Sequence, residues 1–256
     1  MVIDTTFWAV VVASLFSLAV NTTGIVAITR RADWARANAL IFVAFAAGTL
    51  VTLSFMSIIP EAGEMNGAAP AYLVGGFFGL LIVDRLVTGH LEHDEARLVD
   101  DHVDPGGGTA HTTGIVSMLG IGLHSLIDGV IFAVTFQVSV LTGALAALGM
   151  ILHEFPEGIL TFVLLEQGGM GRRRAAWYAF VAAALTTPLG ALAAYPFVDR
   201  LSEEALGALL AIAGGALVYV GAAHLLPQVA HEGRVRNLLA VGAGVVVAAV
   251  LALTGE

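Results

Sequence analysis

Two short motifs in the middle of long apolar runs carry the side chains that could do chemistry. Each pairs a histidine with a carboxylate four residues later: His124 with Asp128, and His153 with Glu157. Residues four apart on an α-helix lie only about 40° from each other around its surface, so each pair points in one direction. Imidazole nitrogen and carboxylate oxygen are ligands that divalent ions such as zinc accept. Two such pairs on facing helices would supply four donors and hold one ion.

The second motif carries an additional acid, Glu154, which lies about 100° from His153 around the same helix and would permit a second ion beside the first. Single histidines in apolar segments usually serve packing and hydrogen bonding. A carboxylate at the centre of a bilayer, however, costs at least ~2.5 to 3.5 kcal/mol. Three acids and two histidines in two mid-helix motifs therefore favour a metal site over a purely structural role.

The composition is that of an integral membrane protein. Of 256 residues, 58% are hydrophobic and only 12% are charged, and the mean hydropathy is +0.89. Without cysteine, any metal site must use nitrogen and oxygen ligands. The net charge of −9 suits cation attraction, although an acidic chain without lysine also fits a salt-adapted organism. The arginines form no basic face, so nucleic acid is not an expected partner.

Apolar runs long enough to span about 30 Å of hydrocarbon predict an all-α polytopic membrane protein with eight transmembrane helices. We expect these helices at roughly 7–29, 37–59, 70–88, 114–136, 141–166, 175–198, 204–227 and 237–254. No run of the sequence indicates a second domain, so we expect one transmembrane domain over residues 1–256.

The arginines predict the orientation of these helices. They fall in the first, third, fifth and seventh loops, and only Arg200 falls on the opposite side. The positive-inside rule then places the odd-numbered loops in the cytoplasm and both termini outside. The third loop, at about 89–113, is long and polar and contains His90 and His93 among several acids. It is either a solvated linker or a weak cytosolic metal-binding segment.

Parts of the chain repeat each other. The motif at His124 recurs 29 residues later at His153, in a helix of opposite direction. The segment Ser57-Ile58-Ile59-Pro60-Glu61, near the end of the second helix, is similarly echoed by His224-Leu225-Leu226-Pro227-Gln228 near the end of the seventh. Inverted repeats around a polar site near the midplane are typical of alternating-access transporters.

At these residues the sequence resembles the ZIP family of divalent metal transporters, whose fourth and fifth helices carry motifs of the forms HNxPEG or HNFxDG and HExPEG or HExPHE. In the fourth helix, His124, Ser125 and Asp128 match the histidine, the asparagine and the acid; in the fifth, His153, Glu154, Pro156 and Glu157 match directly. The resemblance also covers the eight-helix layout, the outside termini and the histidine-bearing third loop.

The resemblance implies a bundle of three, two and three helices with a binuclear metal site halfway through the membrane, and ions that move toward the cytoplasm. Three departures from the family pattern each weaken a donor. Ser125 replaces an asparagine carbonyl, Ser57 stands where many members carry histidine, and Thr187 stands where some place a glutamate that serves the second site. One well-formed site with a poorer neighbour is therefore expected.

The predicted function is transport of divalent transition-metal cations, with zinc as the expected ion, across the plasma membrane by alternating access at His124, Asp128, His153 and Glu157. Acids such as Glu61 in the outer second loop would concentrate cations at the entrance. His224 and His231, on the cytoplasmic side, would help the ion to leave. The expected partners are the metal ion and the lipid bilayer, and family membership allows a homodimer.

Two other functions fit parts of the pattern. His153-Glu154-x-x-Glu157 differs from the zinc-protease motif HExxH only in its last ligand, so an intramembrane metal hydrolase could use Glu154 as general base. A structural or receptor-like membrane protein with a fixed metal is the other alternative. Exchange separates it from a transporter, because a transported ion must leave.

Overall fold

The computed structural model is helical over the residues that it describes, which are 5–88, 109–232 and 234–254. In chain order the helices are α1 (Thr5–Arg30), α2 (Ala32–Leu53), η1 (Ser54–Ile58), α3 (Ile59–Met65), α4 (Ala69–Thr88), α6 (Thr109–Val138), α7 (Val140–Gln167), α8 (Arg172–Ala179), η3 (Phe180–Ala184), α9 (Thr186–Val198), α10 (Glu203–Val218), η4 (Tyr219–Leu225), α11 (Leu226–Glu232) and α12 (Val235–Thr254). Within these described ranges, eight segments are long and apolar enough to cross a membrane, which confirms the predicted eight spans. Helices are the form such runs take because hydrocarbon offers backbone groups no other hydrogen-bond partner.

Within the part of the chain that the structure describes, three of the spans contain a wider, π-helical turn. The second span consists of α2, η1 and α3, the sixth of α8, η3 and α9, and the seventh of α10, η4 and α11. Both η1 and η4 end shortly before a proline, Pro60 and Pro227 respectively. Proline cannot donate to the carbonyl four residues earlier, and a π-turn is one way for a helix to accommodate that gap. Hydropathy alone did not predict these turns.

The two helices that carry the motifs, α6 and α7, are joined by a single residue, Ser139. Its side chain accepts a hydrogen bond from the backbone amide of Thr142 at 3.0 Å and so caps the start of α7. Helix α7 ends shortly before Gly169, whose positive φ of 81° suits glycine. The short connection makes α6 and α7 antiparallel neighbours, which brings the two motifs to the same depth. Helix α6 begins at Thr109, a few residues before the apolar run that predicted it.

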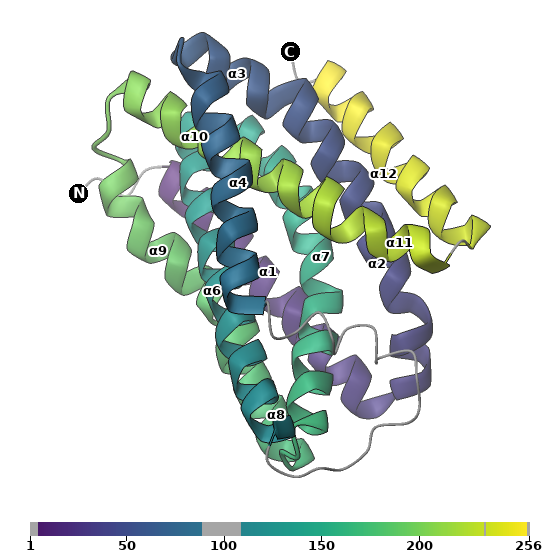
Figure 1. Cartoon of the computed structure of the whole chain (residues 1–256). Helices are drawn as coiled ribbons and strands as arrows, with labels where there is room; N and C mark the ends of the chain where they lie inside the picture. Colours follow the sequence, from purple (N-terminus) through teal and green to yellow (C-terminus); the bar gives the residue numbers. More distant parts are fainter. Residues whose placement is uncertain (1–4, 89–108, 233, 255–256) are drawn as a thin grey trace.

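The packing follows a regular scheme around α6 and α7, which contact each other extensively (Figure 1). Helix α1 packs on α7, and α9 packs on α6. Farther out, α2 packs on α12 and α4 packs on α10. When the first three spans are matched to the last three, and α6 to α7, these contacts form equivalent pairs. The α1–α7 contact corresponds to the α6–α9 contact, and the α2–α12 contact corresponds to the α4–α10 contact. The scheme is that of two inverted repeats, as the sequence predicted.

Glycines at the helix crossings show the same repeat residue by residue. A Cβ added to Gly158 of α7 would lie 2.4 Å from the backbone oxygen of Asn21 in α1, and one added to Gly129 of α6 would lie 2.1 Å from that of Thr187 in α9. Glycines on the partner helices make the same contacts in the opposite direction: Gly24 of α1 faces the backbone of Phe155, and Gly190 of α9 faces that of Leu126. The outer helix pairs show equivalent contacts: Gly48 with Val241, Gly244 with Phe45, Gly76 with Ile212 and Gly215 with Leu73. Paired glycines thus let the backbones approach closely at four crossings.

Candidate metal site

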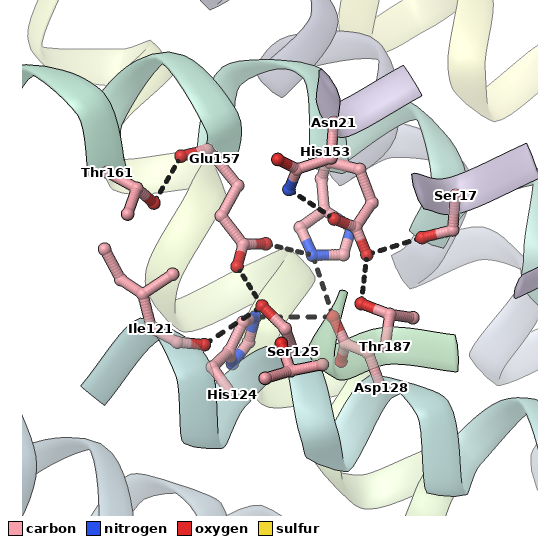
Figure 2. Close-up of polar contacts among 12 residues, drawn as sticks. Ser17, Asn21, Ile121, His124, Ser125, Asp128, His153, Glu157, Thr161 and Thr187 are labelled. Atoms are coloured by element: carbon pink, nitrogen blue, oxygen red, sulfur yellow. Dashed lines mark hydrogen bonds and ion pairs between the residues drawn. The ribbon is translucent and has the colours of Figure 1, made fainter. Parts of the chain in front are cut away.

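The two motifs meet between α6 and α7, and Figure 2 shows their side chains pointing toward one another. Four side chains each offer one ligand atom, and these atoms all lie within 4.8 Å of one another: His124, Asp128, His153 and Glu157. We call these four residues the donor cluster. The spacing of four residues aligns each pair on its helix, and the short α6–α7 connection turns the pairs to face each other.

His153 lies at the centre of the donor cluster. Its Nε2 atom is 3.1 Å from Oδ2 of Asp128 and 3.5 Å from Oε2 of Glu157. His124 Nε2 lies 3.6 Å from the same Asp128 oxygen. The two imidazole rings are 5.8 Å apart between centroids and nearly perpendicular, at 79°. A nitrogen and oxygen set of this kind matches what zinc and similar divalent ions accept.

The facing atoms of the donor cluster are buried without hydrogen-bond partners. Asp128 Oδ2, His153 Nε2 and Glu157 Oε2 are inaccessible and accept or donate no hydrogen bond. These carboxylate oxygens lie next to imidazole nitrogens but accept no hydrogen bond, which is unfavourable for buried carboxylates, and a bound cation would remove that cost. The side chain of His124 is 28% exposed, against 3% for Asp128 and 6% for His153. The donor cluster therefore fits a divalent cation, with its one open side at His124.

Ser125 holds one of the ligands in place. Its hydroxyl donates to Oε1 of Glu157 at 2.5 Å and lies 3.0 Å from the backbone oxygen of Ile121 (Figure 2). This contact leaves Oε2 of Glu157 facing the donor cluster. Ser125 thus contacts a candidate ligand through its hydroxyl.

Glu154 is not one of the four residues of the donor cluster, and its hydrogen bonds go to α1 and α9. It accepts hydrogen bonds from Ser17 at 2.7 Å, from Asn21 at 2.7 Å and from Thr187 at 3.1 Å. Thr187 was a predicted site residue, whereas Ser17 and Asn21 were not. A signal for them existed in the sequence, because Ser17 and Asn21 are polar residues four positions apart in a mostly apolar run. Their partner on another helix was not recognisable from that run alone.

The other predicted path residues lie on the second and seventh spans. Ser57 is half-buried in η1, and Glu61 in α3 accepts a hydrogen bond from Thr142 at 2.5 Å, next to the start of α7. His224 is half-buried in η4, and His231 is exposed in α11. None of these four belongs to the donor cluster found among the described residues. The loop histidines, His90 and His93, lie outside the described residues.

Comparison with known proteins connects the site to one family. The sequence profile of the family described as "ZIP Zinc transporter" matches residues 89–252. Zinc transporter ZIP9-B of Xenopus laevis is 29% identical over 170 residues, which cover 63% of this chain and 52% of the relative. Zinc transporter ZIP13 of Pongo abelii is 25% identical over 82% of this chain and 66% of the relative, and metal cation symporter ZIP14 of Mus musculus is 31% identical over 42% and 21%. The chain thus spans about half the length of the ZIP9 relatives that it matches.

Proposed function

We propose that this chain, which belongs to the ZIP zinc transporter family, carries divalent transition-metal cations, with zinc as the expected ion, across the membrane toward the cytoplasm. The observation that carries the proposal is the donor cluster: two imidazoles and two carboxylates converge within 4.8 Å in the middle of the fourth and fifth spans. Their facing oxygens and nitrogen have no other partner. Such a group is suited to replace the water shell of a divalent ion.

Transport requires that the donor cluster opens first to one side of the membrane and then to the other. An inverted repeat supports such alternating access, because it offers two related conformations around one central site. In the described conformation His124 is the exposed edge of the donor cluster, so an ion would enter or leave past its imidazole. In this proposal Glu61 attracts cations at the outer end, and Ser57, His224 and His231 line the remaining path.

We place both termini outside the cell and the odd-numbered loops in the cytoplasm, with the plasma membrane as the location. What supports this orientation is that arginines gather at one end of the bundle. Arg172 donates to the backbone oxygen of Thr29, and Arg236 donates to that of Ala37 at 2.8 Å. These contacts hold the first, fifth and seventh loops at a common end, which the positive-inside rule assigns to the cytoplasm. The whole chain forms one transport domain in this proposal, with a cytoplasmic loop at about 89–113, and a homodimer is its proposed assembly.

The hydrolase alternative loses its support. The family to which the chain belongs consists of transporters. A general base must also reach the metal-bound water within about 2.6–3.2 Å. Glu154, the only candidate for that role in the hydrolase motif, accepts three hydrogen bonds from the protein instead.

Zinc uptake into proteoliposomes that contain a zinc-sensitive dye tests the proposal. We expect uptake by the wild type and none by a variant that combines His153→Ala with Asp128→Ala. Asp199→Ala, which removes an exposed carboxylate outside the site, is the matched control and should transport normally. Zinc that is not transported by the wild type and that stays bound after chelation would refute transport and favour a fixed metal.

A further inference from the structure

The three buried carboxylates of the motifs differ in what their oxygens contact. Asp128 and Glu157 each keep one oxygen without a hydrogen-bond donor, and both of these oxygens face His153. Both oxygens of Glu154, by contrast, accept hydrogen bonds. The donors are the hydroxyls of Ser17 and Thr187, which bind Oε1, and the amide nitrogen of Asn21, which binds Oε2.

The surroundings of Glu154 are closed. Glu154 and its three partners are all 0% exposed. An ionised carboxylate has about four lone-pair positions, and protein hydrogens already occupy three of them here. A cation that approached these oxygens would meet the positive ends of the donor dipoles. It would also have to displace donors that have no water to turn to, and buried donors without a partner are unfavourable.

The donors come from both halves of the inverted repeat. Asn21 lies on α1 opposite Gly158, and Thr187 lies at the equivalent place on α9 opposite Gly129. Backbone contacts at these glycines hold both helices against the central pair. The hydrogen bonds to Glu154 are therefore supported by two close helix crossings and not by mobile surface groups.

We propose that Ser17, Asn21 and Thr187 keep Glu154 out of the metal ligand set, so that the protein holds a single divalent ion at the donor cluster. Ser17, Asn21 and Thr187 are positioning residues that act through Glu154 and determine the number of ions. The inference rests on the proposed function only in treating the bound ion as cargo. One transport event then moves one divalent ion.

The number of bound ions tests the inference directly. The full-length protein in detergent is equilibrated with zinc, freed of excess, and analysed for zinc per chain by elemental analysis. We expect one zinc in the wild type and one in Glu154→Gln, because Glu154 contributes no ligand in this proposal. A glutamine amide can accept from both hydroxyls and pair with a reoriented Asn21. Glu157→Gln is the matched substitution three residues later, and it should weaken zinc binding by more than about 10-fold.

Two zinc ions in the wild type that fall to one in Glu154→Gln would overturn the inference. The wild-type count decides the question even where the variant does not fold, and X-ray absorption of the zinc-loaded wild type gives a second measurement. An absorption spectrum with a shell of nitrogen and oxygen and no neighbouring zinc supports a single ion, and a zinc–zinc distance near about 3.5–4 Å refutes it. Uptake measured on the same preparation separates the proposals. Uptake with two ions refutes only the single-ion inference, and one retained ion without uptake refutes only transport.

Discussion

Replacing Gly158 by alanine should push α1 away from α7 beside the donor cluster. The added Cβ would lie 2.4 Å from the backbone oxygen of Asn21 and 2.7 Å from its side-chain oxygen. Carbon–oxygen contacts normally begin near 3.3 Å, so the two helices must separate by roughly 1 Å at this point. Because Asn21 also donates to Glu154, the same movement stretches a buried hydrogen bond.

The size of the effect follows from two opposing contributions. Overpacking of a well-packed interior costs about 1–3 kcal/mol. Alanine in place of glycine in a helix recovers roughly 0.5–1 kcal/mol of conformational entropy. A net loss of about 1–2 kcal/mol corresponds to a fall in melting temperature of roughly 2–8 °C for a chain of this size.

Thermal unfolding in detergent measures this loss, and zinc uptake measured in parallel should fall as well. Gly242→Ala is the matched control, because no atom lies within 4 Å of a Cβ added there, and its melting temperature should stay constant or rise. Gly129→Ala, which meets Thr187 in the other repeat, should behave like Gly158→Ala. If Gly158→Ala is as stable and as active as Gly242→Ala, the close approach of α1 and α7 is not as described.

Three other perturbations probe the donor cluster and the outer end of α7. His153→Ala should abolish tight zinc binding in a dye competition assay, whereas His124→Ala should weaken it less, because His124 lies at the exposed edge of the donor cluster and His153 at its centre. Equal losses would contradict the central place of His153. Zinc at about 100 times its dissociation constant should raise the free energy of unfolding of the wild type by about 2.7 kcal/mol, and it should not raise that of Asp128→Asn. The same increase in the variant would show that zinc binds at another site. Thr142→Val removes the hydrogen bond to Glu61 and should lower stability by about 1–2 kcal/mol with unchanged zinc affinity, so reduced affinity would show that this contact also supports the donor cluster.

The spans could be predicted from the sequence because hydrocarbon imposes a simple requirement on length and polarity. The fifth apolar run, expected at 141–166, is helix α7 at Val140–Gln167. The second was expected to end near residue 59, but its helix continues to Met65. Pro60 and Glu61 lower the hydropathy at that end, yet the π-turn before them keeps the chain helical. Hydropathy counts apolar side chains and contains no information on how backbone hydrogen bonds are rearranged.

The donor cluster could also be predicted, since spacing along one helix determines which side chains share a face. His153 and Glu157 are an example: their alignment needs no knowledge of any other helix. The surroundings of Glu154 are different, because Ser17 and Asn21 are more than 130 residues away along the chain. Their role depends on the packing of α1 against α7, which Gly158 permits. A glycine in an apolar run does not reveal which backbone it will meet.

The π-turns change the helical phase of the spans that contain them. One additional residue in a turn rotates everything that follows by about 100° relative to a regular α-helix. Glu61 meets Thr142 only because η1 has introduced this rotation. Deletion of one residue within η1, such as the exposed Phe55, would leave the span helical but would turn Glu61 to another side. Since η4 lies at the corresponding place before Pro227, both repeats use a change of phase, and not a break in the helix, to orient the ends of their spans.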